Sequence, residues 1–280
     1  MSAAADRARA AFRHRYGPWA LVTGASRGIG RAVALELAER GLDLLLVARS
    51  GPELQDLARH IGAMHPVACE PLPADLGHDA GVAAVLARAK ALDIGLVVHA
   101  AGFGTSGPFL GTAADAEADL LAVNALAPLR LSHALAPRLA ARGRGGLVFL
   151  SSIVAFQGVP RAANYAASKA YVQSLAEALA IELRPHGVDV LASAPGPVNS
   201  GFAARAGMVM AHAADPPTVA AATVAALGHG ATARPGALSK LLGWSLATAP
   251  RALRVRIMAA IMAGMTRETH RGGDRAGSGP

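Results

Sequence analysis

The stretch WALVTGASRGIGRAVALELAERG, residues 19–41, joins a short apolar run to a helical pattern through a turn rich in glycine. The apolar run WALVT stops at Gly24, and the helical pattern opens at Gly30 and ends at Gly41. A continuous apolar run predicts a strand buried on both faces, and glycine permits the tight turn that follows it. The stretch therefore predicts a strand, a turn and a helix in succession.

The same unit repeats along the chain. Strands separated by helices imply parallel crossover connections, and the ligand crevice of such a sheet lies at the carboxyl ends of its strands. We therefore predict the α/β class, with a doubly wound parallel sheet. Further strands are expected at 42–48, 65–72, 94–100, 145–152 and 188–194, and longer helices near 113–142 and 162–184.

Composition limits the class of protein. A chain of 280 residues with 52% hydrophobic and 16% charged residues is globular, and one domain is the default. Its one cysteine, Cys69, forms no internal disulfide and gives no support for a metal site, which predicts a cytoplasmic location without a metal. The basic charge, +8 overall, lies at the two ends of the chain without interleaved aromatic residues, which argues against nucleic-acid binding.

The domain organisation follows from these patterns. We predict a flexible basic leader at 1–17 and an α/β domain at 18–235. A C-terminal helical extension is expected at 236–268 and a disordered tail at 269–280.

The turn TGASRGIG, residues 23–30, matches a pattern that binds dinucleotides. Gly24, Gly28 and Gly30 would let the backbone approach a pyrophosphate at the N-terminus of the following helix, and Ser26, Arg27 and Ile29 lie in the same turn. The motif is short, so an ordinary glycine turn is the alternative, but its place between the first strand and first helix favours a dinucleotide.

The end of the second expected strand indicates which dinucleotide binds. No acid stands between Asp43 and Glu53 to accept hydrogen bonds from a ribose 2′-hydroxyl, whereas Arg49 follows the strand directly. Arg49 and Arg27 together favour a 2′-phosphate, which predicts NADP(H). Two solvated surface arginines are the alternative.

Tyr165 and Lys169 are four residues apart in a helical pattern, so both lie on one helix face. The chain holds three tyrosines and three lysines, which makes this pair uncommon. Lowering a phenol pKa from about 10 toward 7 requires about 4 kcal/mol, and a nearby ammonium supplies much of that. With Ser152 at the end of a strand, the pair predicts an acid/base site; an exposed Tyr–Lys pair is the alternative.

These motifs occur in a fixed order: TGASRGIG, Asp75-Leu76, Asn124, Ser152, Tyr165 with Lys169, and Pro195-Gly196. In that order they resemble the short-chain dehydrogenase/reductase family over roughly residues 18–235. The resemblance implies a Rossmann sheet of about seven strands, a substrate lid near 197–217, and a homodimer or homotetramer.

The resemblance also implies a role for each site residue. Tyr165 would donate a proton to the substrate oxygen, Ser152 would polarise the carbonyl, Lys169 would bind the nicotinamide ribose and lower the phenol pKa, and Asn124 would hold a water. Further cofactor contacts are carried over to Asp75, Leu76, Ala101, Gly102, Pro195, Gly196, Val198 and Ser200, the last standing where the family often has threonine.

One stretch departs from the family pattern. His99-Ala100-Ala101-Gly102 stands where the family commonly has Asn-Asn-Ala-Gly, and Ala100 cannot make the side-chain hydrogen bonds of an asparagine. His99 either replaces one of those partners or is a packed core histidine.

The last third of the chain gives the least information about function. Met208 and Met210 either line an adaptable apolar pocket or pack on the body, and the helical pattern at 250–268 packs on the domain or a partner, a peripheral membrane contact being less favoured. The overall prediction is an NADPH-dependent oxidoreductase that reversibly reduces an apolar carbonyl compound, of ketone or 3-oxoacyl type, to a secondary alcohol. A noncatalytic NADP(H)-binding regulatory or scaffold protein is the alternative.

Overall fold

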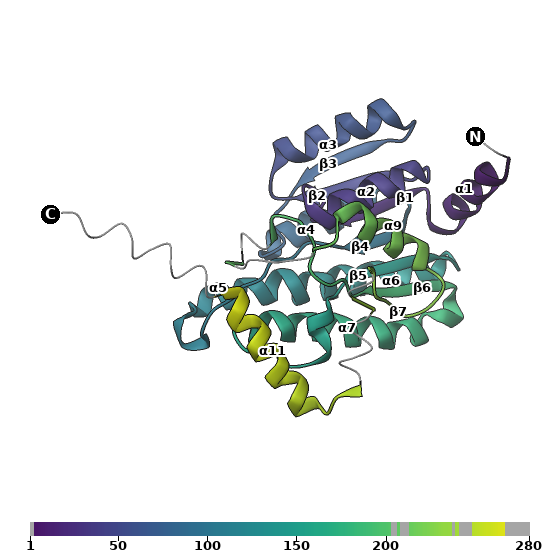
Figure 1. Ribbon diagram of the computed structural model, residues 1–280. Helices are drawn as coiled ribbons and strands as arrows, with labels where there is room; N and C mark the ends of the chain where they lie inside the picture. The colour runs from purple at the N-terminus through teal and green to yellow at the C-terminus, as the bar shows by residue number, and fades with distance from the viewer. Residues whose placement is uncertain (1–2, 203–205, 208–212, 237–238, 241–247, 267–280) are drawn as a thin grey trace.

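The computed structural model describes residues 3–202, 206–207, 213–236, 239–240 and 248–266. Within these ranges, seven strands form one parallel sheet in the order β3-β2-β1-β4-β5-β6-β7 (Figure 1). The predicted doubly wound sheet is therefore confirmed. The strands are β1 (Trp19–Thr23), β2 (Asp43–Ala48), β3 (Cys69–Pro73), β4 (Ile94–His99), β5 (Gly145–Leu150), β6 (Val188–Ser193) and β7 (Thr232–Ala233).

The strand order reverses direction at β1. This strand pairs with β2 on one side and with β4 on the other, so Thr23 at its end lies beside both Val47 and His99. Ligands of open parallel sheets bind where the order reverses, at the carboxyl ends of the strands. The glycine turn follows β1 directly and therefore begins at this position.

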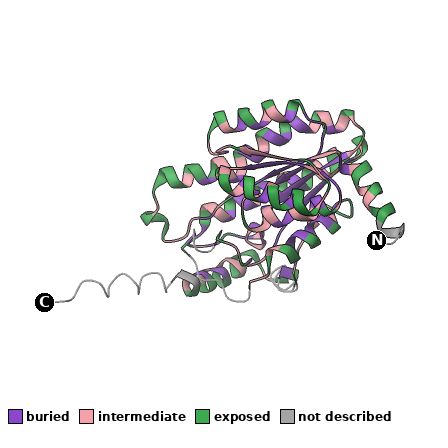
Figure 2. Ribbon diagram, turned by 90° about the horizontal axis from the view of Figure 1, so that it is seen from above, coloured by how far each residue is buried: buried purple, intermediate pink, exposed green. Residues whose placement is uncertain are grey.

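Hydrophobic residues cover both faces of the sheet, because alternate side chains of each strand point to opposite faces. The helices are α1 (Ala3–Tyr16), α2 (Gly28–Glu39), α3 (Gly51–Met64), α4 (Asp79–Lys90), α5 (Ala114–Leu121), α6 (Ala127–Ala141), α7 (Ala163–Glu182), α9 (Pro216–Ala226) and α11 (Arg251–Thr266), with short 3₁₀ segments η1 (Phe109–Gly111), η3 (Ile153–Phe156) and η4 (Arg184–His186). In β1, Ala20 and Val22 pack with α2, α3 and α9, whereas Leu21 packs with α4, α6 and α7. The central strands β1, β2, β4, β5 and β6 are mostly buried, and the outer helix faces are exposed (Figure 2).

The helical stretch expected near 113–142 is interrupted. Between α5 and α6 the chain forms the π-helical segment η2 (Ala122–Leu126), which contains the buried Asn124. A π turn inserts one extra residue and is frequent at functional sites. The interruption therefore falls at a residue that the sequence places in the site.

The C-terminal third is described in part. α11 lies within the extension expected at 236–268, the expected lid near 197–217 is described only in part, and the expected tail at 269–280 lies outside the described residues. Among the helices that can be described, none has the length and apolar character needed to cross a membrane.

Most of the basic leader expected at 1–17 is helical. Residues 3–16 form α1, which ends on the buried Tyr16. The Tyr16 hydroxyl donates to Asp189 Oδ2 at 2.6 Å, and the Arg15 guanidinium donates to both oxygens of the same carboxylate at 2.8 and 2.9 Å. Asp189 belongs to β6, so these bonds attach α1 to the central sheet.

We expect Tyr16→Phe to lower the free energy of unfolding by about 1–2 kcal/mol, because it removes a partly buried hydrogen bond and leaves Asp189 with fewer donors. Urea denaturation measures this change. The control is Tyr171→Phe, the same substitution at a tyrosine that is 41% exposed. Equal stability of the two variants would contradict the anchoring role of α1.

Candidate active site

The glycine turn between β1 and α2 packs against backbone with no room for side chains. A Cβ at Gly30 would lie 2.2 Å from the carbonyl oxygen of Gly24, and a Cβ at Gly24 would lie 2.6 Å from the amide nitrogen of Ala101. Gly24 and Gly28 also have φ of +69° and +56°, which disfavour L side chains. The turn therefore requires glycine at these positions.

Thr23 connects the turn to the end of β4. Its buried hydroxyl donates to the carbonyl oxygen of Val98 and accepts from the amides of Ala100 and Ala101, each at 3.2 Å. Motif reasoning did not single out Thr23, although its position at the first residue of TGASRGIG is visible in the sequence. It holds the backbone that runs beside the turn.

The opposite side of the turn meets the stretch after β6. A Cβ at Gly28 would lie 3.0 Å from Cβ of Ser200, so the structure brings Ser200, a cofactor contact implied by the resemblance, next to the glycine turn. Val198 is buried, and the Gly196 amide donates to Ser239 Oγ at 2.6 Å. The Pro195 carbonyl accepts from the Ile153 amide, which connects this stretch to the segment that follows β5.

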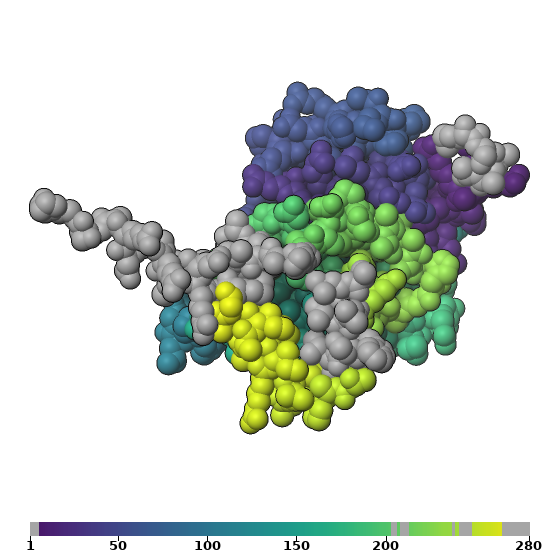
Figure 3. Space-filling view, in the orientation of Figure 1, coloured from purple at the N-terminus to yellow at the C-terminus, as the bar shows by residue number. Residues whose placement is uncertain are grey.

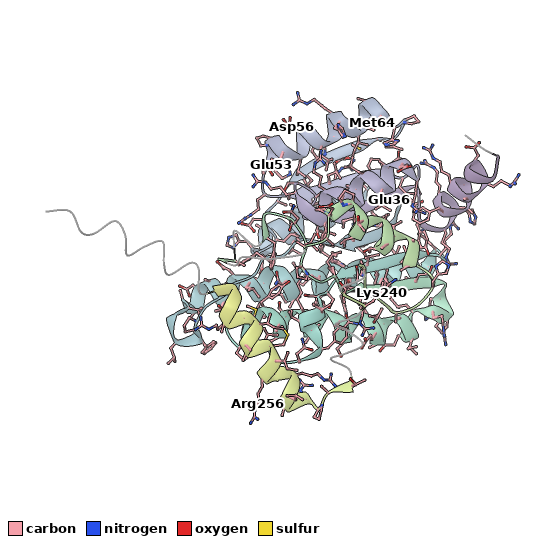
Figure 4. The ribbon with its side chains drawn as sticks, viewed as in Figure 1. Glu36, Glu53, Asp56, Met64, Lys240 and Arg256 are labelled. Atoms are coloured by element: carbon pink, nitrogen blue, oxygen red, sulfur yellow. The ribbon has the colours of Figure 1, made fainter. Side chains whose placement is uncertain are left out.

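The two arginines expected at a 2′-phosphate lie in different environments. Arg49 is exposed directly after β2, whereas the exposed Arg27 makes a paired interaction with Glu53, its Nε donating to Oε2 at 2.9 Å. Hydrogen bonding from Arg27 lowers the pKa of the Glu53 carboxyl. Glu53 lies near the start of α3 (Figure 4), so a carboxylate neighbours the predicted phosphate site.

The carried-over adenine contacts follow β3. Asp75 Oδ1 accepts from the Gly77 amide at 3.0 Å, and Leu76 is a buried member of the core that includes α4. The Ala74 amide donates to the Ala48 carbonyl, which holds this loop next to the end of β2. Asp75 and Arg49 thus lie on neighbouring strand ends.

Lys169 is buried on α7, with 7% of its surface exposed. Its Nζ donates to the Leu150 carbonyl at 2.8 Å, and burial lowers its pKa to about 8. A Cβ at Gly102 would lie 3.4 Å from this Nζ and 2.9 Å from Asn124 Oδ1. The structure therefore brings Lys169, Asn124 and Gly102 together.

Asn124 makes three hydrogen bonds, two of them to the backbone of Phe103 and one to Ser168. Its Oδ1 accepts from the Phe103 amide at 3.0 Å, while Nδ2 donates to the Phe103 carbonyl at 2.9 Å and to Ser168 Oγ at 3.1 Å. Ser168 in turn donates to the Tyr165 carbonyl at 2.7 Å. Ser168 was not predicted as a site residue, although it directly precedes Lys169 in the sequence.

Tyr165 and Ser152 meet at the carboxyl edge of the sheet. Burial raises the pKa of Tyr165 to about 12, and a side-chain hydrogen bond with Ser152 acts in the opposite direction. The Lys169 ammonium lies 5.7 Å from the centroid of the phenol ring, but it donates to Leu150. In the protein without cofactor the phenol pKa is therefore raised, because burial outweighs the hydrogen bond, and its depression by Lys169 together with a nicotinamide stays a prediction.

His99 is a packed core histidine that also makes a side-chain hydrogen bond. It is 4% exposed and packs on Phe149 with ring centroids 4.8 Å apart, and its Nε2 is 2.8 Å from Ser132 Oγ of α6. Burial lowers its pKa to about 3, so the ring is neutral at physiological pH. His99 thus connects β4 to α6 without adding charge.

The donors and the close backbone match a dinucleotide better than a metal ion. The glycine turn forms a cradle that any Cβ would fill, at the amino end of α2, where backbone amides favour a pyrophosphate. Within the described part of the chain, His, Cys, Asp and Glu form no group of three or more that would hold a metal.

A family model described as short chain dehydrogenase matches residues 18–208. The chain belongs to this family. Short chain dehydrogenases are oxidoreductases, and the match ends before α9 and α11.

Two similar proteins are informative about the chain. It is 36% identical over 180 residues to a very-long-chain 3-oxoacyl-CoA reductase of Pyrenophora tritici-repentis, covering 62% of this chain and 53% of that protein. It is 32% identical to a 7beta-hydroxysteroid dehydrogenase of Clostridium sardiniense, covering 64% and 69%. The chain thus spans about half the length of the fungal reductase.

Among solved structures, a short-chain dehydrogenase from Sphingobium yanoikuyae in complex with NADPH has a TM-score of 0.77 and 30% identity. The likeness covers 94% of this chain and 99% of that one, so it extends beyond the family match.

The buried Lys169 gives this short chain dehydrogenase a specific pH dependence. Its pKa is about 8 in the fold against an ordinary 10.5, so between these values the unfolded chain holds a proton that the folded chain has released. Stability relative to Lys169→Met should therefore rise from pH 8 to 10.5 and be lost as pH falls through 8.

Urea denaturation of both proteins at pH 7, 8, 9 and 10 measures this difference. Lys90→Met, at an exposed lysine of α4, is the control and should track the wild type. If the Lys169→Met and wild-type stabilities run parallel across the range, the lowered pKa is wrong.

Proposed function

We propose that this chain is an NADP(H)-dependent carbonyl reductase that converts a ketone or 3-oxoacyl compound into a secondary alcohol, reversibly. The observation that carries the proposal is the convergence of Ser152, Tyr165, Lys169 and Asn124 beside Gly102, at the sheet edge that the glycine turn also borders. The names of the relatives, a 3-oxoacyl-CoA reductase and a hydroxysteroid dehydrogenase, support the reaction class.

The proposed cofactor site comprises the glycine turn and the neighbouring strand ends. Bound NADP(H) supplies the hydride in reduction and accepts it in oxidation. Lys169 would hold the nicotinamide ribose, and the small Ala101 and Gly102 leave the backbone accessible. The other residues proposed to hold it are Gly24, Ser26, Arg27, Gly28, Ile29, Gly30, Arg49, Asp75, Leu76, Pro195, Gly196, Val198 and Ser200.

Tyr165 and Ser152 would act on the substrate oxygen. The Ser152 hydroxyl hydrogen-bonds the carbonyl oxygen and polarises it, and the Tyr165 phenol transfers its proton to that oxygen as the carbonyl carbon is reduced. The product is a secondary alcohol, and Tyr165 is left as a phenolate near the Lys169 ammonium. With a pKa of about 12, Tyr165 holds its proton at neutral pH, which is the protonation state that reduction requires at its start.

Asn124 and Ser168 would fix the position of the Tyr165 phenol relative to the Lys169 ammonium. Their hydrogen bonds connect the π segment to α7 between Tyr165 and Lys169. Positioning of this kind costs no reorganisation during the reaction.

The test of the reaction is turnover of NADPH with a panel of methyl ketones, diaryl ketones and 3-oxoacyl thioesters. We expect Tyr165→Phe to lower kcat/KM by about 10²- to 10⁴-fold, because it removes the proton donor and keeps the ring. Tyr171→Phe should leave the rate unchanged. Wild-type activity no greater than that of Tyr165→Phe on every compound, with tight NADPH binding retained, would favour a noncatalytic NADP(H)-binding protein.

The same assay tests the preference for lysine at 169. Lys169→Arg keeps the charge but places a larger planar group where Nζ bonds the Leu150 carbonyl, beside Gly102. We therefore expect impaired turnover despite the retained charge. A fully active arginine variant would show that charge alone suffices.

Cofactor choice is a separate prediction. Arg27→Ala and Arg49→Ala should each weaken NADPH binding about tenfold more than NADH binding, because each removes a charge-assisted contact to the 2′-phosphate. Glu53→Gln should shift the ratio toward NADPH, since it releases Arg27 from a carboxylate. Fluorescence titration of both nucleotides measures these ratios, and unchanged ratios in both arginine variants would overturn the choice of NADP(H).

A further inference from the structure

α11 lies beyond the family-matched residues 18–208, yet it packs beside Tyr165. Met258 and Met262, four residues apart, are 6% and 4% exposed and so form one buried helix face. They belong to an apolar cluster against which Tyr165 and Phe202 pack. The other members of the cluster are Val159, Ala162, Ala166 and Ala206, with Val154 packed against them.

The residues of α11 are distributed unusually between its faces. Leu253, Ile257 and Ile261 are 47%, 37% and 42% exposed, whereas the two methionines lie in the buried cluster against which Tyr165 packs. Methionine is unbranched and adapts its shape to what it contacts, unlike the stiffer isoleucine. The face of α11 toward Tyr165 is therefore its adaptable face.

Phe202 fills the space between this cluster and the loop after β4. Its ring centroid is 5.2 Å from that of Tyr165, and a Cβ at Gly104 would lie 2.6 Å from Phe202 Cζ. The phenol thus has an apolar ring on one side and the methionine face of α11 close by.

α11 also reaches the segment that carries Ser152. A Cβ at Gly158, shortly after η3, would lie 3.6 Å from Val255 Cγ2. α11 is on the molecular surface (Figure 3), and Arg256 points away from the body (Figure 4). The helix therefore packs on the outer side of two parts of the chain, the segment that follows β5 and the start of α7.

We propose that Met258 and Met262 are specificity-determining residues that limit the size of the apolar group flanking the substrate carbonyl. The inference rests on the proposed reduction at Tyr165. A carbonyl oxygen within reach of both the Tyr165 and Ser152 hydroxyls directs its carbon substituents to the adjoining surface, which here is apolar and includes α11. An apolar substituent matches that surface, and shortening its side chains makes room for a larger one.

The experiment compares Met262→Ala and Met258→Ala with Ile261→Ala, which shortens an exposed residue of the same helix. The probes are 2-butanone, acetophenone and benzophenone, reduced with NADPH. We expect each methionine variant to raise the ratio of kcat/KM for benzophenone over 2-butanone on the order of tenfold, and the control to leave it unchanged. NADPH affinity should not change in any variant.

Met258→Phe and Met262→Phe provide a second measurement if the alanine variants are unstable. They should lower the same ratio, because they narrow the space beside the phenol. A purely structural helix predicts instead a uniform loss for all three ketones, or no change of the ratio in folded variants, and either result would overturn the proposal.

Benzophenone binding in the presence of NADP⁺, measured by calorimetry, separates this inference from the proposed reaction. If the wild type turns over no ketone, tighter benzophenone binding to Met262→Ala than to Ile261→Ala still supports a size limit set by the methionines. Equal binding to both variants would refute that size limit independently of turnover.

Discussion

The site depends on the absence of side chains where β1 ends against β4. Gly24 and Gly30 let the turn close on its own carbonyl and on the amide of Ala101, at distances that no Cβ could share. Thr23 then ties both amides after β4 to the same strand end. β1 and β4 lie where the strand order reverses. Their contact therefore determines where Ser152, which follows β5, and Lys169 of α7 lie relative to the turn.

The groups that would perform the chemistry are unfavourable for the fold. Burying Lys169 disfavours its charged form, and burying Tyr165 disfavours the phenolate, so each pKa moves in the direction that opposes ionisation. The Leu150 carbonyl and the Asn124–Ser168 hydrogen bonds compensate part of this cost while they position the side chains. The site therefore contains side chains whose burial is unfavourable, and the surrounding hydrogen bonds keep them in position.

Local patterns in the sequence predicted the structural features that depend on residues close together in the chain. The continuous apolar strands, the glycine turn, and the pairing of Tyr165 with Lys169 on one helix face follow from short-range geometry. The contact of Arg15 and Tyr16 with Asp189 joins residues more than 170 positions apart, and no local pattern encodes it. The roles of the predicted site residues and the oligomeric state stay predictions.

The same distinction applies to the periphery of the site. The Arg27–Glu53 pair depends on how α3 leaves β2, and the position of Met262 beside Tyr165 depends on the packing of the last helix. Composition showed that these residues exist but not which surface each would meet. The raised phenol pKa was missed for the same reason, since burial is a property of the assembled fold.

The π segment Ala122–Leu126 has a consequence for how the length of the chain can vary. Each residue of an α-helix turns it by about 100°, so a deletion within α6 would rotate every later side chain of that helix. A deletion within the π segment would instead restore a regular α turn and keep α5 and α6 in phase. A descendant shortened by one residue here would retain the fold but lose the displaced backbone that presents Asn124 to Phe103 and Ser168.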